Sequence, residues 1–407
     1  MSSPAVIVFA GPRDRYESAL ALQENQALEA LVTEAYFSKF WAQTNLLGNY
    51  FHRFASHRHH HDLPSDKVVT SLISFYHVLA SRINPRKNCP HLCASDRNLS
   101  IRAAEIAIQR QVPLIAYSYY ASAGFRLMEN KGLKKILFQV HPHGRFLREL
   151  FTLEIEKCPE ARSSIMEETE MSPLYDDNND SFLEADGIIC ASSFTRLSLH
   201  KVGSMAPTHV VNYGVDVELF SPRTSLPVAK TFTVGFIGAL SQRKGARYLL
   251  GALAKFPKGS VKLIIYTRSV INRDLIKGFE SVEVEIRQGL NDRQLAEDIK
   301  QCDIMALPSI AEGFGLVILE SMACGVPVLC TTSTGGLDFI SHHKDGFVVE
   351  PGSVESIYEI LVWGMKNRDE LFQIGLAARQ KAENFTWAKY RRNFYESYLS
   401  LINQHVL

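Results

Sequence analysis

The sequence predicts an α/β protein of two doubly wound, Rossmann-like domains that face a central cleft. Three observations lead to this prediction. Short apolar runs alternate with helix-like segments, which is typical of a parallel sheet covered by helices. The alternation occurs twice, on either side of a turn-rich stretch at Ser221–Pro227. The 407 residues are 46% hydrophobic and 21% charged, which suits globular domains and excludes global disorder.

The first half of the alternation begins with a strand over Ala5–Phe9. An amphipathic stretch over about Glu17–Ala30 follows it and predicts a helix. Short β-rich runs predict three more strands, at Val112–Tyr117, Lys135–Val140 and Gly187–Ser192. Polar and turn-forming residues predict three irregular segments, at His57–Asp62, Asn84–Pro90 and Asp176–Asp180.

The second half repeats this pattern. Its predicted strands are Thr233–Ile237, Val261–Tyr266, Val282–Ile286, Asp303–Leu307, Val326–Cys330 and Gly346–Val349. Its predicted helices are one that ends near Leu253, then Leu295–Lys300 and Leu316–Ala323. Apolar and aromatic residues near helical spacing over Phe385–Ile402 predict a helix long enough to cross back to the first domain. We therefore place the first domain at residues 1–210, the second at 211–385 and the return helix at 386–407.

Composition excludes several classes of protein. Lys and Arg total 44 and Asp and Glu total 43, so a nucleic-acid partner, which usually requires a basic excess, is not expected. No stretch approaches the roughly 20 apolar residues that span a bilayer, and the first residues predict a strand instead of a signal peptide. The seven cysteines form no CxxC pair, which indicates reduced thiols. We expect a cytoplasmic protein; composition gives no indication of its oligomeric state.

The segment Pro308–Pro327 carries the most chemical information. A strand ends at Pro308, a glycine-containing loop follows, and a helix begins near Gly315. Free backbone N–H groups and the positive end of the helix dipole would meet there, which suits a phosphate or diphosphate. Glu312 lies in the loop, where it would face a substrate hydroxyl, and Glu320 lies on the helix, where it would accept both hydroxyls of a ribose. The alternative is that both are solvated surface charges.

This segment resembles the Glu-x7-Glu motif of retaining glycosyltransferases with the GT-B fold, particularly glycosyltransferase family 4 (glycosyl transferases group 1). The resemblance implies that Glu320 holds the nucleotide ribose and that Glu312 is a catalytic residue beside the donor sugar. It also implies donor binding by the loop residues Gly313, Phe314, Gly315 and Leu316. Further similar stretches are spread along about two thirds of the chain: Ala185–Arg196, Asn212–Pro222, Cys302–Ser309, Gly335–Gly336 and Asp345–Gly352.

The turn Gly238–Gly245 holds two cations that would neutralise a diphosphate leaving group. Lys244 matches the lysine of the family. This chain has Ala239 where the family commonly has an arginine. Either Arg243 supplies that arginine, or it is absent. The alternative is that both cations are solvated.

In the first domain, His141 follows a strand and matches a family histidine beside the reacting sugar, with His143 as the second choice. The loop with Gly11 and Arg13 would face the acceptor, or else form a charged turn. The histidine run in His57–Asp62 lacks the spacing of a zinc site and predicts a solvated loop, so no metal site is predicted. The absence of an Asp-x-Asp motif agrees with transfer that needs no metal.

We expect a retaining, metal-independent hexosyltransferase of polysaccharide or glycolipid biosynthesis. Its donor would be a nucleotide-diphosphate-sugar, used as a co-substrate without a further cofactor. Its acceptor would be a saccharide or a lipid-linked saccharide, and the second case would bring the protein to a membrane surface. The alternatives are a nucleotide-sugar isomerase or hydrolase on the same fold, and a non-catalytic subunit that binds sugar nucleotides.

Overall fold

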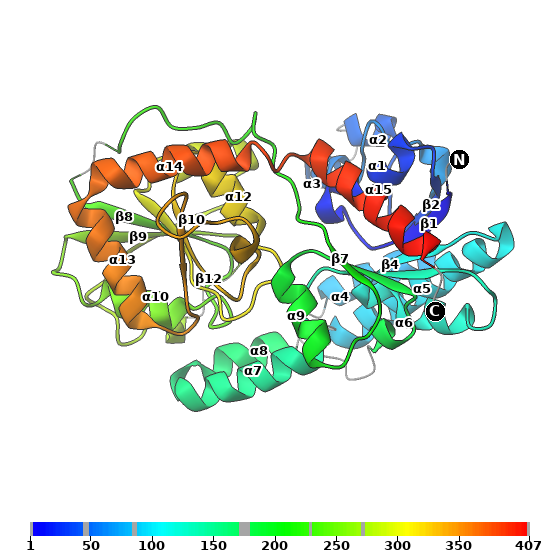
Figure 1. Ribbon diagram of the computed structural model, residues 1–407, viewed down its shortest axis with the longest axis horizontal. Coiled ribbons are helices and arrows are strands. Elements are labelled where there is room, and N and C mark those ends of the chain that lie inside the picture. Colours follow the sequence, from blue (N-terminus) through cyan, green and yellow to red (C-terminus); the bar gives the residue numbers. More distant parts are fainter. Residues whose placement is uncertain are drawn as a thin grey trace.

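The computed structural model describes residues 3–43, 49–83, 88–170, 180–227, 230–269 and 273–404. It contains two parallel sheets, each flanked by helices, in two domains that lie side by side along the long axis of the molecule (Figure 1). The predicted fold class is confirmed. Among the described residues, no helix is both long enough and apolar enough to cross a membrane.

The first sheet has the strand order β3-β2-β1-β4-β5-β6-β7. Its strands are β1 (Ala5–Val8), β2 (Leu28–Thr33), β3 (Val68–Thr70), β4 (Leu114–Tyr117), β5 (Lys135–Gln139), β6 (Gly187–Cys190) and β7 (Thr208–Val210). Its helices are α1 (Glu17–Glu24), α2 (Lys39–Gln43), α3 (Asn49–Ser56), α4 (Leu72–Ile83), α5 (Asn88–Arg110), α6 (Ser122–Leu127), α7 (Gly144–Lys157), α8 (Arg162–Glu170) and α9 (Ser193–Lys201). The central strands β1, β4 and β6 are fully buried, which explains their unbroken apolar sequences.

The second sheet has the order β10-β9-β8-β11-β12-β13. Its strands are β8 (Phe232–Ile237), β9 (Val261–Thr267), β10 (Glu283–Gln288), β11 (Ile304–Leu307), β12 (Val328–Thr331) and β13 (Phe347–Val349). The helices that follow in this domain are α10 (Ala246–Leu253), α11 (Asp292–Ile299), α12 (Leu316–Ala323), α13 (Val354–Lys366) and α14 (Arg368–Ala382). In both sheets the order reverses beside the first strand, so the loops after the inner strands gather at one edge, where ligands of such sheets bind.

The predicted strands are present in both domains, but two other expectations are wrong. The stretch Glu17–Ala30 is not one helix: α1 ends at Glu24, Gln26 has a φ of 55°, and strand β2 begins at Leu28. The positive φ ends the helix, and the apolar residues after it pair with β1. The segment Asn84–Pro90 is not irregular throughout, because α5 begins at Asn88. Residues 84–87 and 176–179 of the predicted irregular segments lie outside the described residues.

Helices cross between the domains in both directions. Helix α15 (Trp387–Asn403) follows the second domain in sequence but packs against α1 and β6 of the first, as the sequence predicted (Figure 1). In the opposite direction, α7 and α8 extend from the first domain to the second (Figure 1). Their contact includes an apolar cluster, in which Phe151 and Ile165 pack with Ile310. It also includes buried hydrogen bonds: Gln242 Nε2 donates to Glu154 Oε1 on α7 at 2.7 Å, and Gln242 N donates to Ser164 Oγ on α8 at 3.1 Å.

Candidate functional site

A cavity of about 250 Å³ lies between the two domains. Both sheets contribute to it, because the loops after β1 and β5 line one side and the loops after β8 and β11 line the other. The lining includes these residues that the sequence singled out: Arg13, His141, Lys244, Glu312, Phe314, Gly315 and Leu316. The fold therefore brings together residues that are up to 303 positions apart in the chain.

Glu312 is the central residue of a cluster of charged side chains on the second-domain side of the cavity. Its Oε2 lies 3.2 Å from Lys244 Nζ and 3.2 Å from Arg243 Nη1. Burial alone would raise the pKa of Glu312, but the Lys244 and Arg243 cations lower this pKa to about 2. Glu312 is therefore a carboxylate at every physiological pH, and its charge is already neutralised by its neighbours.

His141 faces this cluster from the first domain. Burial, reinforced by the Arg13 cation, lowers the pKa of His141 to about 4. The imidazole is therefore neutral near pH 7, so it can orient a hydroxyl but carries no positive charge to a leaving group. His143, the second choice, is the N-cap of α7: its Nδ1 accepts from Arg145 N at 3.3 Å, and it does not line the cavity.

The loop between Glu312 and α12 contacts the first domain directly. Gly313 O accepts hydrogen bonds from Ser192 Oγ at 2.5 Å and from Thr195 Oγ1 at 3.0 Å, at the start of α9. A Cβ at position 313 would lie 2.2 Å from Val140 O, so only glycine permits this approach. Gly313 thus joins the domains and does not line the cavity, whereas Gly315, with a φ of 84°, turns the chain into α12.

Glu320 lies on the next turns of α12 and outside the cavity lining. Burial raises its pKa to about 7, although Arg15 lowers it. Arg15, on the first-domain loop, pairs across the domain boundary with Asp292 at 2.9 Å. Glu320 and Glu312 therefore occupy different environments, because Glu312 is fixed as a carboxylate and Glu320 can gain a proton near neutral pH. Their predicted roles stay predictions.

Arg243 differs from Lys244 in its surroundings. Its Nε donates to Glu168 of α8, and its Nη1 donates to Ala311 O at 3.0 Å as well as to Glu312. Arg243 does not line the cavity. Lys244 is thus the cation that the second domain exposes to the cavity, and the question of whether Arg243 replaces the arginine missing at Ala239 stays open. Glu168 was not anticipated, because nothing in its local sequence links it to residues 75 positions away.

A second cavity, of about 400 Å³, lies within the first domain and shares Arg13 and His141 with the first cavity. Gly11 lines it, and Gly11 N donates to Glu34 Oε2 at 2.6 Å. The charges on its wall are balanced: Arg58 pairs with Glu34 at 3.2 Å, and Asp96 lies close enough to Arg13 for each to affect the pKa of the other. Glu34, Arg58 and Asp96 were not identified from the sequence, because each lies in a different segment.

Asp14 is the other residue that sequence reasoning missed. It lines the cavity between the domains, and its Oδ2 accepts from Tyr117 OH at 2.6 Å and from Ser18 Oγ. Burial raises its pKa to about 7, although Ser18 and Tyr117 lower it through these hydrogen bonds. Asp14, Arg15 and Tyr16 all have positive φ, between 41° and 67°, a strained backbone that is typical of functional sites. The sequence signal that could have identified Asp14 is the charged turn after Gly11.

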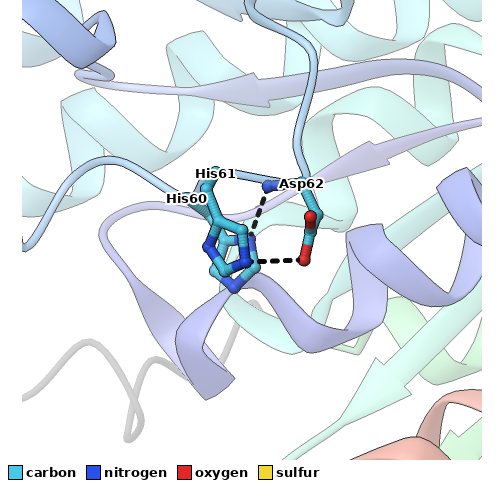
Figure 2. Close-up of side chains that lie close together, drawn as sticks. All are labelled: His60, His61 and Asp62. Carbon is cyan, nitrogen blue, oxygen red and sulfur yellow. Dashed lines mark hydrogen bonds and ion pairs between the residues drawn. The ribbon is translucent and has the colours of Figure 1, made fainter.

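The predicted histidine loop brings three potential metal ligands together, and none of the three lines either cavity. The ligand atoms of His60, His61 and Asp62 lie within 4.8 Å of one another (Figure 2). Some of these ligand atoms already interact within the loop. Asp62 N donates to His60 Nδ1 at 3.2 Å, and His61 Nε2 lies 3.0 Å from Asp62 Oδ2. His61 and Asp62 are exposed, in agreement with the expected solvated loop. The absence of a metal site stays a prediction.

Comparison with known proteins identifies the second domain. Residues 220–381 match the family model described as "Glycosyl transferases group 1". The matched region contains Lys244, Glu312 and Glu320. Over these residues the second domain is similar to the group 1 glycosyl transferases.

Curated relatives of this glycosyl transferase domain act on different compounds according to their names. The sulfoquinovosyl transferase SQD2 of Arabidopsis thaliana is 29% identical over 43% of this chain and 36% of its own length. A D-inositol 3-phosphate glycosyltransferase of Corynebacterium urealyticum is 26% identical over 47% of this chain and 51% of its own length. The chain thus spans about a third to a half of the length of these relatives.

Solved structures extend the similarity to both domains. A sucrose-phosphate synthase of Thermosynechococcus elongatus superimposes with a TM-score of 0.65 over 98% of this chain and 99% of the other, at 15% identity. The Anabaena protein HepE, solved in complex with UDP-glucose, gives a TM-score of 0.64 over 98% and 99% of the two chains, at 17% identity. At these identities the similarity establishes the fold, which is the GT-B arrangement of two Rossmann-like domains.

Proposed function

We propose that the protein is a glycosyltransferase that moves a sugar from a nucleotide-diphosphate-sugar donor to an acceptor hydroxyl. One observation carries the proposal: Lys244 and Glu312 of the group 1 domain face His141 of the first domain across one cavity. A cation suited to a leaving diphosphate, a fixed carboxylate and a neutral imidazole therefore surround the place where a donor and an acceptor would meet.

The donor would lie along the second domain. The N-terminus of α12 offers backbone N–H groups to the diphosphate, and Lys244 adds a positive charge. Glu320, further along α12, would accept the ribose hydroxyls. The name of HepE, which binds UDP-glucose, and those of the curated glycosyltransferases support a sugar nucleotide as the donor.

The acceptor would enter from the first domain, where the 400 Å³ cavity reaches His141. Retention at the anomeric carbon is supported by the Glu-x7-Glu pattern. A double displacement would need a free carboxylate nucleophile, but Glu312 is held by two cations. We therefore favour front-face attack, in which a donor phosphate oxygen takes the proton of the acceptor hydroxyl. His141 would orient that hydroxyl, and closure of the two domains would exclude water.

The experiment incubates the purified protein with a panel of nucleotide-diphosphate-sugars, with and without saccharide and lipid-linked acceptors, in the presence and absence of EDTA. The expected result is release of the nucleoside diphosphate that depends on an acceptor, survives EDTA and gives a product with the donor's anomeric configuration. Conversion of the donor to an epimer, or hydrolysis that acceptors never suppress, would contradict the proposal. Donor binding without turnover on any acceptor would indicate a non-catalytic subunit.

A further inference from the structure

The outer face of α4 carries large apolar side chains in water. Leu72 is 83% exposed, Tyr76 64%, Ile73 60% and Leu79 42%. Their spacing places them on one side of the helix. The other side packs against the domain, where Ser74 Oγ donates to Ser95 O on α5 at 3.1 Å. Clustered exposed apolar residues of this size usually mark a surface that another body covers.

Helix α2 adds two exposed aromatic residues, Phe40 (58%) and Trp41 (39%). A run of aromatic contacts through α3 connects them with α4. The ring centroids in this run lie 5.6–6.2 Å apart, in the pairs Trp41–Phe51, Phe37–Phe51, Phe37–Phe54 and Phe54–Phe75. The exposed residues of α2 and α4 therefore rest on one packed aromatic layer, and we call Phe40, Trp41, Leu72, Ile73, Tyr76 and Leu79 together the apolar face.

The segment that carries the apolar face has an excess of basic residues. Its described parts, 35–43, 49–83 and 88–95, contain five Lys and Arg and two acidic residues, Asp62 and Asp66, and one of the five, Arg58, pairs with Glu34. The same segment holds seven of the 14 histidines of the chain. Because the whole chain has a net charge of only +1, positive charge is concentrated here and negative charge elsewhere. Lys39 lies directly beside Phe40 and is exposed, as are His57 and His61.

The apolar face and the basic residues of its segment together indicate what kind of partner binds there. Apolar side chains flanked by Lys and Arg bind anionic lipid surfaces, with about 1 kcal/mol per basic residue near the membrane, and Trp and Tyr favour the interface between lipid and water. A second copy of the chain fits less well, because a twofold interface would bring the same positive segment of each copy against the other. A nucleic acid would match the charge but not the apolar side chains.

The position of α4 also connects this surface with the second cavity. Val78 on the inner side of α4 and Leu92 on α5 line the 400 Å³ cavity that contains Arg13 and His141. The apolar face and the cavity therefore lie on opposite sides of the same helix. We propose that the apolar face docks on an anionic lipid bilayer, so that an acceptor anchored in that bilayer enters the cavity beside α4. The identity of the acceptor rests on the proposed function, whereas the docking does not.

The test measures co-sedimentation of the full chain with vesicles of phosphatidylcholine alone and of phosphatidylcholine with phosphatidylglycerol. Wild type should bind the anionic vesicles at least about tenfold more tightly than the neutral ones, and salt should weaken this binding. The double variant Leu72→Gln/Tyr76→Gln should bind anionic vesicles about tenfold to a hundredfold more weakly than wild type. The matched control is Leu183→Gln/Met205→Gln, which removes two other exposed apolar residues of the first domain (66% and 94% exposed) and should bind as wild type does.

Two further measurements keep the outcomes distinct. Thermal shift with nucleotide sugars should be the same for wild type and both double variants, because the apolar face is remote from the donor residues. Vesicle binding without any donor-induced shift would overturn the proposed function alone. Equal vesicle binding by wild type and Leu72→Gln/Tyr76→Gln, or no binding to anionic vesicles, would overturn the docking. The docking would also be overturned if analytical ultracentrifugation showed that wild type forms a dimer without lipid and that Leu72→Gln/Tyr76→Gln is a monomer.

Discussion

The ion pair between Lys244 and Glu312 fixes two charges at the wall of the cavity before any substrate binds. The side chains are 14% and 12% exposed, so water screens their interaction only weakly. An incoming diphosphate would compete with Glu312 for Lys244, while Arg243 would still neutralise the glutamate. Lys244 would thus bind the leaving diphosphate, and Arg243 would neutralise Glu312.

Lys244→Met should lower kcat for sugar transfer by roughly 10²- to 10³-fold, the usual cost of removing one donor that stabilises developing negative charge. KM for the donor should rise less than kcat falls, because the charge on the leaving diphosphate is greatest in the transition state. Steady-state kinetics with a donor and acceptor pair would measure this. Lys258→Met, at an exposed position of the same domain, is the control and should leave kcat unchanged. An unaltered kcat in Lys244→Met would contradict the assignment.

Glu320 gives a prediction about pH. Its pKa is about 7, raised by burial, and only the carboxylate can accept hydrogen bonds from both ribose hydroxyls. Donor affinity should therefore rise roughly tenfold between about pH 6 and about pH 8, as the fraction of ionised Glu320 rises. Isothermal titration with an intact nucleotide sugar, whose diphosphate does not titrate in this range, measures the change. Glu320→Gln should bind more weakly at high pH and show a flat profile; a rise that persists in this variant would exclude Glu320 as its source.

Among the elements, the loop between β11 and α12 does more than carry Glu312. Its Gly313 carbonyl accepts two hydrogen bonds from α9, and α9 itself begins at a Ser192 N-cap. The loop that would bind the donor is thus hydrogen-bonded to the domain that would bind the acceptor. A change at Gly313 should therefore affect both stability and transfer.

Gly313→Ala should destabilise the protein by about 1–3 kcal/mol, because its Cβ would lie 2.2 Å from the Val140 carbonyl oxygen, which belongs to the backbone. The same displacement should lower kcat, since His141 follows Val140. Urea unfolding and steady-state kinetics measure the two effects. In the control Gly251→Ala, on α10, the new Cβ would lie 3.3 Å from the nearest side-chain atom, so little change is expected. A normal kcat in Gly313→Ala would show that the loop can shift without consequence.

The elements that the sequence predicted well are those with a strong local signal. Buried parallel strands such as β1 and β4 have unbroken apolar runs, and α12 follows a glycine-containing loop. The boundary between α1 and β2 is marked in the sequence only by the four polar residues Gln23–Gln26, which are also common inside helices. In the structure the positive φ of Gln26 separates the two elements. Strand β3, with three partly buried or exposed residues, has too short a pattern to be distinguished.

The same reasoning applies to the site. Glu312, Lys244 and His141 follow predicted strands, and the topology brings strand ends together. Asp14 and Glu34 also follow strands, β1 and β2, but β2 was not predicted. The contacts of Asp14, Glu34 and Glu168 are with side chains from distant segments. For these residues, the sequence shows that the side chain is charged but does not indicate which other residues it contacts.

For the molecule as a whole, the two domains are connected by crossing elements in both directions. The α7–α8 pair carries first-domain residues to Gln242 and Arg243, and α15 carries Tyr390 and Arg391 to α1. Arg391 Nη1 donates to Glu17 Oε2 at 2.5 Å, and Glu17 is only 6% exposed. Burial raises the pKa of Glu17, although Arg391 lowers it. The contact of α15 thus depends on a charged pair that is largely removed from water.

Arg391→Met should lower the free energy of unfolding by roughly 3 kcal/mol at about pH 8, because it leaves the Glu17 charge buried without its partner. The loss should be smaller at about pH 5. Without Arg391 the pKa of Glu17 in the folded state rises further, the folded state then binds more protons than the unfolded state, and stability falls as the pH rises. Urea unfolding at both pH values measures this. Arg392→Met, at an exposed position on the same helix, should cost little; equal losses for the two variants would contradict the role of the pair.

The return of α15 to the first domain has a consequence for synthesis on the ribosome. The residues of α1 emerge early, whereas Tyr390 and Arg391 emerge only after the whole second domain has been made. Until then Ser18 and Glu17 lack these partners, and the side of α1 and β6 that α15 covers faces water. The first domain therefore cannot reach its final stability as an independent unit during translation, even though its sheet is complete much earlier. Ribosome-bound chains that end before residue 387 should be more sensitive to protease in the first domain than the released protein is.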